Sequence, residues 1–229
     1  MKILLIMLIS IISTIVIYQA MKKVYARVYT PFMVPIVTGT TLIVCLLLLF
    51  NISYNTYMIG GKWIVDLLGP AVVALAHPLY KQWPTIRKYA MPIMTGVLAG
   101  TVIGIISGIE LSLLFGIETM TLYSMVPKSV TSPVAMDIAN VIGGSPTLAA
   151  VFVMVAGISG AVIGPFLLKW SGIHHYLGRG IGFGSASHGI GTAKALELGE
   201  EEGAISSIAM TLSAIFASIL SPLFVQLLL

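Results

Sequence analysis

Charge is scarce in this sequence. Only 9% of its 229 residues are Asp, Glu, Lys or Arg, whereas a soluble domain carries roughly 25%. Hydrophobic residues make up 58% of the chain, and its mean hydropathy is +1.03. A water-soluble fold of this length cannot bury so much apolar surface, so the composition excludes a soluble domain and predicts an integral membrane protein.

Cysteine is nearly absent too, since Cys45 is the only one. A single cysteine excludes an intramolecular disulfide, and no ligand spacing typical of a metal site surrounds it. The sequence also lacks a His-Glu-x-x-His pair and a glycine-rich loop after a strand. Ser187 and His188 are adjacent, and neighbouring side chains on a helix point about 100° apart, so they cannot act as nucleophile and base. We therefore expect no enzyme activity, metal or cofactor.

The alternating polarity that a membrane β-barrel requires is missing as well. The apolar runs instead approach the roughly 20 residues that a helix needs to cross hydrocarbon. They predict an all-α integral membrane protein with about six full transmembrane helices, at Ile3–Ala20, Pro31–Phe50, Trp63–Tyr80, Ala90–Leu111, Leu148–Trp170 and Ile205–Leu228. We expect one polytopic membrane domain over residues 1–229, with N-terminal helices in 1–60 and a core in 61–229.

The basic residues gather in short connections between the apolar runs. The chain has 12 Lys and Arg against 8 Asp and Glu, a formal charge of +4. Basic connections tend to stay on the cytoplasmic side of a membrane. We therefore expect Lys22–Arg27, Lys81–Lys88 and Lys169–Arg179 to be cytoplasmic, with both termini outside. Because topology accounts for the basic excess, nucleic acid is not an expected partner.

Two stretches are too polar and too rich in Gly or Pro for ordinary membrane helices. They are "MVPKSVTSPVAMDIANVIGG" (Met125–Gly144) and "GFGSASHGIGTAKALELGEEEG" (Gly182–Gly203). At membrane depth, backbone groups freed by a helix break must be satisfied by protein or by a water-filled cavity. We therefore predict two broken or re-entrant segments, Met125–Gly144 and Gly182–Gly199, which meet near the middle of the bilayer.

The two stretches also resemble each other. "SVTSPVA" begins at Ser129 and "SASHGIG" at Ser185, an offset of 56 residues. A long apolar run with a small-Pro pair follows each, giving repeats near 125–170 and 182–228. Opposed repeats of this kind would form an inverted repeat, a design typical of transporters. Chance similarity between stretches of small residues is the alternative.

The second stretch supplies five candidate ligands for an anion: Ser185, Ser187, His188, Thr192 and Lys194. Backbone N–H groups at a helix start, flanked by hydroxyl and cationic side chains, bind anions. The alternative for the small residues is close helix packing. For Lys194 the alternatives are an ion pair with Glu197 or extension towards the membrane surface.

The first stretch supplies the opposite side of the candidate site. Ser129, Thr131 and Ser132 offer hydroxyl groups. Asp137 and Asn140 follow at a spacing of three residues, which places them on one helix face. Asp137 either exchanges a coupling proton or forms an ion pair with Lys194, and the sequence leaves both roles open.

Four motifs resemble the LrgB/CidB family of bacterial membrane proteins: "YNTYMIGGKWI", "HPLYK", "VPKSVTSPVA" and "GFGSASHGIGTAKALE". The similarity extends from about residue 51 to the C-terminus. Family members are called holin-like or antiholin-like and are linked to murein hydrolase export and programmed lysis. The resemblance also covers a plastid glycolate/glycerate translocator, and it implies pyruvate transport together with a small LrgA/CidA-like membrane partner.

These family functions differ in mechanism. A pore needs oligomerising spans, whereas a transporter needs two broken elements with converging polar groups, which this sequence has. Our first hypothesis is a multi-pass protein of the bacterial cell membrane that transports small monocarboxylates such as pyruvate, glycolate or glycerate. The alternative is a holin/antiholin-like regulator of murein hydrolase export and cell lysis. The expected partners are the lipid bilayer, the carboxylate and the small family partner, and a homo-oligomer stays open.

Overall fold

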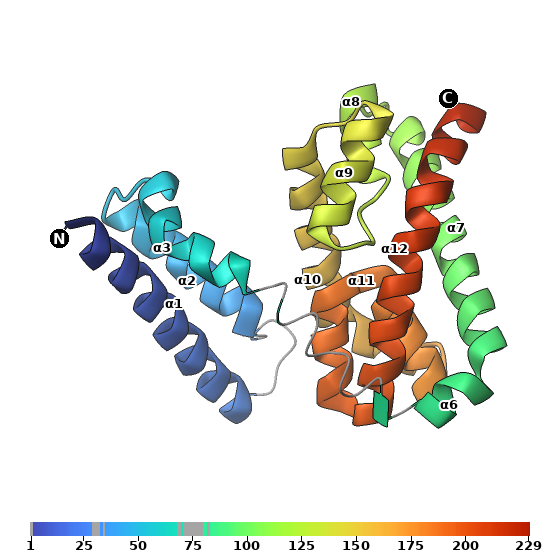
Figure 1. The fold of residues 1–229 in the computed structure, drawn as a ribbon, viewed down its shortest axis with the longest axis horizontal. Helices are drawn as coiled ribbons and strands as arrows, with labels where there is room; N and C mark the ends of the chain where they lie inside the picture. Colours follow the sequence, from blue (N-terminus) through green and yellow to red (C-terminus); the bar gives the residue numbers. More distant parts are fainter. Residues whose placement is uncertain (1, 29–32, 34, 68–69, 71–79, 82) are drawn as a thin grey trace. The chain divides into compact units, whose positions relative to one another are not determined.

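The computed structural model describes residues 2–28, 33, 35–67, 70, 80–81 and 83–229. In these residues ten helices are assigned and no strand. They form two compact units, Met1–Ala76 and His77–Leu229, and Figure 1 shows the helices of each.

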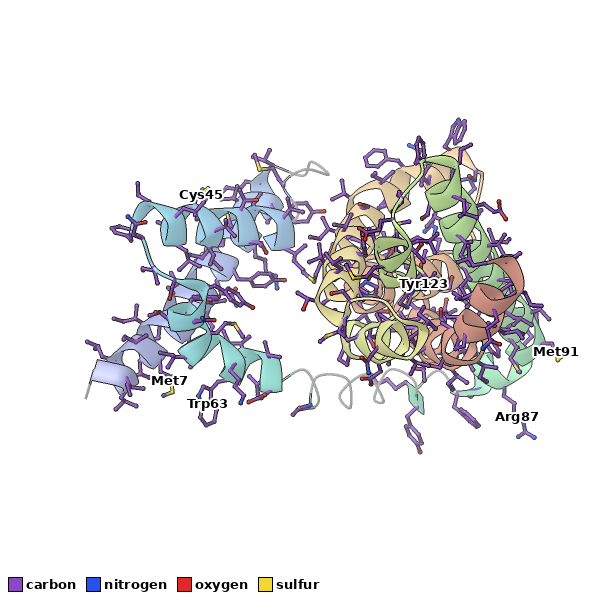
Figure 2. All side chains as sticks on the ribbon, turned by 90° about the horizontal axis from the view of Figure 1, so that it is seen from above. Met7, Cys45, Trp63, Arg87, Met91 and Tyr123 are labelled. Atoms are coloured by element: carbon purple, nitrogen blue, oxygen red, sulfur yellow. The ribbon has the colours of Figure 1, made fainter. Side chains whose placement is uncertain are left out.

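The first unit consists of three helices, α1 (Lys2–Arg27), α2 (Pro35–Leu49) and α3 (Tyr54–Asp66). Helix α1 contacts both others. Gly60 lets α3 approach α1 closely, because a Cβ there would lie 2.5 Å from the Met7 carbonyl oxygen. Thr14 and Tyr57 join the same two helices through a hydroxyl–hydroxyl hydrogen bond of 2.8 Å. The labelled Trp63 lies on the outside of this unit (Figure 2) and is 60% exposed, as a lipid-facing side chain would be.

Two helices of this unit differ from the sequence prediction. Helix α1 continues to Arg27, so the basic residues of Lys22–Arg27 lie in its last turns rather than in a connection. Helix α3 begins at Tyr54, well before the predicted start at Trp63, because Ser53 caps it by accepting from the Thr56 N–H at 3.2 Å. Polar residues and glycines lower the hydropathy of this early part. The rest of the predicted Trp63–Tyr80 span falls largely on residues 68–69 and 71–79, outside the described residues.

The second unit contains the other described helices: α6 (Trp83–Lys88), α7 (Ala90–Leu114), α8 (Thr119–Met125), α9 (Ser132–Ile142), α10 (Pro146–Trp170), α11 (Tyr176–Leu198) and α12 (Glu200–Leu228). Helix α11 packs most extensively against α12 and then against α10, and α12 also contacts α7. Buried aliphatic side chains from α7 and α12 form one core cluster, Ile93, Val97, Ile205 and Ala209. Helix α11 therefore contacts all three long helices of this unit, α7, α10 and α12.

Four described helices are long and apolar enough to cross a membrane: α1 from Ile3, α7, α10 and α12. Their outward side chains are apolar and exposed, such as Met91 on α7 (Figure 2). The prediction of an all-helical, multi-pass membrane protein is confirmed. The described residues contain four such spans rather than six, since α2 covers 15 residues in place of the predicted Pro31–Phe50. Residues 31, 32 and 34 of that run lie outside the described residues.

Candidate functional site

The first predicted segment, Met125–Gly144, is interrupted between α8 and α9. Residues 126–130 form turns and a bend, and α9 begins at Ser132 with Pro133 in its first turn. The two ends of the segment lie together, because the Ser145 N–H donates to Ser124 Oγ at 2.7 Å. Between these ends the chain runs to the middle of α7 and returns as α9. Thr131 precedes α9, and its side chain makes no capping hydrogen bond to the first turn.

The second predicted segment is interrupted at His188. Its backbone has φ 42° and ψ −131° within α11, so two helical arms meet there. A Cβ at Gly191 would lie 2.5 Å from the Phe183 carbonyl oxygen. In a straight helix these positions would be about 12 Å apart along the axis. The arm after His188 therefore folds back along the arm before it, as the turn at the upper end of α11 in Figure 1 shows.

Helix α7 brings the two segments together. Every fourth residue from 96 to 108 is glycine; the first two lie against α11 and the last two against the first segment. A Cβ at Gly100 would lie 3.2 Å from Ser185 Oγ, and one at Gly104 would lie 3.8 Å from Ser129 Oγ. One helical turn, or about 6 Å along the axis, separates these glycines. The two segments therefore end beside each other, half-way along α7.

Helix α10 supports the turn of α11 from another side. A Cβ at Gly157 would lie 2.8 Å from the His188 ring, and one at Gly160 would overlap the Ser187 side chain. The His188 ring is buried, and its Nε2 atom lies 2.9 Å from the Val153 carbonyl oxygen. Small residues on α10 thus provide the space that the turn needs, and a backbone carbonyl orients the imidazole.

The backbone at His188 is strained. Positive φ with this ψ is a conformation that glycine adopts readily and a residue with a side chain adopts at a cost of about 1–3 kcal/mol. Gly189 follows directly, so the chain has a glycine available but places histidine at the strained position. Strain kept at one position is typical of a functional side chain.

The order of stability of two substitutions measures this strain. In a helix interior glycine is about 1 kcal/mol less stable than alanine. At position 188 we expect the reverse: His188→Gly is more stable than His188→Ala by about 1–2 kcal/mol, since both lose the ring and only glycine relieves the strain. Unfolding by denaturant in mixed micelles measures the difference. Ala186→Gly, in the same helix, is the control and should lose stability in the ordinary way. If His188→Ala were more stable than His188→Gly, the backbone at position 188 would not be strained.

The five candidate ligands of the second segment are buried: Ser185, Ser187, His188, Thr192 and Lys194. Two of their hydroxyl groups bond within the protein. Ser185 Oγ donates to the Ile181 carbonyl at 2.6 Å, and Thr192 Oγ1 donates to the His188 carbonyl at 2.8 Å. Thr192 Oγ1 also lies 2.9 Å from Ser206 Oγ on α12. These contacts give Ser185 and Thr192 a role in holding the turn together.

Lys194 forms an ion pair with Glu197, with 2.7 Å between Nζ and Oε2. The sequence left this pairing open beside an anion-binding role. Because a carboxylate at this distance offsets the ammonium charge, Lys194 is a weaker ligand for a second anion than its burial alone suggests.

The candidates of the first segment divide into two groups. Ser129, Thr131 and Ser132 are half-buried around the point where α9 begins. Asp137 and Asn140 lie further along α9 on its exposed side. The structure therefore groups the three hydroxyl residues at the middle of α7, while the two acceptors lie more than a helical turn away.

Lys128 lies at the same point and is not among the ligands predicted from the sequence. Its Nζ donates to the Gly104 carbonyl at 3.0 Å and also lies against Gly108. The ion pairs recorded among the described residues, Lys194–Glu197 and Arg179–Glu202, do not include it. Its position inside the polar stretch could have identified it from the sequence. An ionisable group at membrane depth costs free energy and is usually functional.

Fold and site together define a class: an all-helical, multi-pass membrane protein in which two interrupted helical segments meet against glycine-bearing helices. The chain belongs to the LrgB-like family, whose profile matches residues 14–227. This confirms the resemblance found in the sequence motifs.

Relatives align over nearly the whole chain. Uncharacterized protein YxaC of Bacillus subtilis is 52% identical over 220 residues, which is 96% of each chain. Holin-like protein CidB of Staphylococcus epidermidis is 37% identical, with 95% of each chain covered. CidB of Staphylococcus aureus is 35% identical, with 96% of each covered. No solved structure matches the chain significantly.

Proposed function

We propose that this protein transports small monocarboxylates, such as pyruvate, glycolate or glycerate, across the bacterial cell membrane. The observation that carries the proposal is the meeting of the two interrupted segments half-way along α7, with the Lys128 ammonium at that point. Helix starts and cationic side chains at the middle of a bundle bind anionic groups in transporters with broken helices.

The groups around this point suit a carboxylate. Lys128 supplies a positive charge, and Ser129, Thr131 and Ser132 supply hydroxyl donors. The first turn of α9 adds backbone N–H groups, and the positive end of its dipole favours an anion. In the second segment, Ser185 lies against Gly100 of α7, one helical turn from the Gly104 carbonyl that Lys128 contacts. A small anion at this point would thus lie between the two segments.

The order of elements supports alternating access. Each interrupted segment precedes a long helix, α10 in one case and α12 in the other. Ser132 begins α9 and His188 marks the turn of α11, and these positions are 56 residues apart, the offset of the sequence motifs. Both ends of the first segment lie near the start of α10, whereas α11, the helix that contains the second segment, begins soon after α10 ends. We infer two re-entrant segments that enter from opposite faces, as in an inverted repeat.

The names of the relatives favour a second candidate. CidB of both staphylococci is named a holin-like protein, and four long apolar helices with exposed apolar faces are what an oligomeric membrane assembly also needs. In this alternative the protein regulates murein hydrolase export and lysis, with a small LrgA/CidA-like membrane partner. A holin-like pore has no evident need for two interrupted segments that meet at one point inside the protein. For that reason we favour the transporter.

Flux through reconstituted protein separates the two candidates. Proteoliposomes containing the purified chain are expected to take up labelled pyruvate or glycolate at a rate that saturates with concentration. A fluorescent dye trapped in the same vesicles should stay inside. Unsaturable uptake together with dye leakage would support the holin-like alternative and refute the transporter.

A further inference from the structure

An apolar groove runs between α10 and α11 on the second unit. It has a volume of about 310 Å³ and is lined mainly by aliphatic and aromatic side chains, including Ile163, Leu167 and Phe183. Small residues from both helices, among them Gly160, Gly164 and Gly182, form most of the rest of its wall and leave the space for the groove. At one end lies Ser187, and at the other end lies Leu168.

Leu168 is also part of the wall of a second cavity, of about 270 Å³, at the C-terminal end of α10. Three basic residues line this second cavity, which we call the basic pocket: Lys169, His174 and Arg179. Because Leu168 lines both cavities, the apolar groove and the basic pocket are neighbours at the C-terminal end of α10. The next residue, Trp170, is 87% exposed. An exposed tryptophan at a helix end is typical of the headgroup region of a membrane.

The charges of the basic pocket are only partly offset. Arg179 lies 3.6 Å from Glu202 and also donates from Nε to the Ile173 carbonyl at 3.4 Å. Lys169 is in the last turn of α10, and the ion pairs recorded among the described residues do not include it. The pocket therefore keeps a net positive charge beside an apolar groove.

We propose that the α10–α11 groove binds one anionic phospholipid, with an acyl chain along the apolar groove and the phosphate in the basic pocket. A free anion would leave the groove empty, and a neutral apolar molecule would leave the basic residues unpaired. A phosphodiester with a hydrocarbon chain fills both. Basic pockets between membrane helices bind anionic headgroups in this way. The headgroup end of this site, at Lys169 and Arg179, lies at the opposite end of the groove from Ser187, so lipid binding does not depend on the proposed transport.

Native mass spectrometry of the full chain in neutral detergent tests the site, with dioleoyl-phosphatidylglycerol as the probe and dioleoyl-phosphatidylcholine as its neutral counterpart. The wild type is expected to retain one phosphatidylglycerol in preference. Lys169→Gln should weaken retention about five- to tenfold, because one headgroup contact is lost. Lys81→Gln removes an exposed lysine outside the pocket and should retain the lipid unchanged.

A second variant tests the groove. Ala186 is an exposed residue of the groove wall, so Ala186→Trp should fill the groove and weaken retention similarly while leaving the unfolding temperature without lipid unchanged. Equal retention of the two lipids, or equal losses in Lys169→Gln and Lys81→Gln, would overturn the proposal. Displacement of the bound lipid by inorganic phosphate at the same concentration would also overturn it, since the pocket would then select a free anion.

Discussion

Replacing Lys128 with glutamine is expected to weaken carboxylate uptake about ten- to hundredfold, the effect of losing one charge-assisted hydrogen bond of roughly 1.5–3 kcal/mol. The amide can still donate to the Gly104 carbonyl that the ammonium contacts. The half-buried side chain therefore keeps its place, and the change removes charge rather than structure. Saturable uptake of labelled pyruvate or glycolate into proteoliposomes gives the KM for this comparison.

Lys88 provides the matched control, since it is an exposed lysine on α6. Lys88→Gln removes the same charge from the same unit and should leave KM unchanged. Lys128→Arg keeps the charge and should retain part of the uptake. If Lys128→Gln transports with the wild-type KM, the carboxylate does not bind at the middle of α7. The main structural support for the transporter proposal would then be refuted.

The second large effect concerns the close approach of α11 and α12. A Cβ at Gly184 would overlap the Ser206 carbonyl oxygen and lie 2.7 Å from Ala209 Cβ. The first of these atoms belongs to the backbone of α12, so it cannot move aside as a flexible side chain would. Gly184→Ala is expected to lower the free energy of unfolding by about 2–3 kcal/mol through overpacking.

Gly182 is the control, two residues away in the same helix. A Cβ there would lie 3.5 Å from Leu168 Cδ2, an ordinary contact. Gly182→Ala should therefore be neutral, or stabilising by up to about 1 kcal/mol, because alanine favours a helix. Denaturant unfolding in mixed micelles compares the two variants. Equal stabilities would show that α11 and α12 are less tightly packed than these distances indicate.

Composition and breaker residues predicted much of this molecule. The low charge and long apolar runs indicated a helical membrane protein. A helix that faces lipid needs an apolar surface whatever its position in the bundle. Both interruptions were also predictable, since Pro133 and the glycines around His188 disfavour a continuous helix whatever surrounds them. These features depend on local chemistry.

The site could be predicted only in part, because its contacts join residues far apart in the chain. The sequence grouped Lys194 with the ligands, but a glutamate three residues away neutralises it. It passed over Lys128, whose place is fixed by a carbonyl on α7, 24 residues away. Ser129 and Ser185 lie one helical turn apart on α7 because positions 104 and 100 are glycine, and nothing local to either serine indicates these glycines.

The spacing of the α7 glycines limits how the length of this helix can vary during evolution. Four residues advance a helix by 400°, so the row turns by about 40° at each step and winds slowly around α7. One inserted residue between Gly100 and Gly104 would turn the later glycines by about 100° and replace them at the contact with larger side chains. Aligned relatives should therefore show no insertion or deletion between positions 96 and 108, even where their loops differ in length.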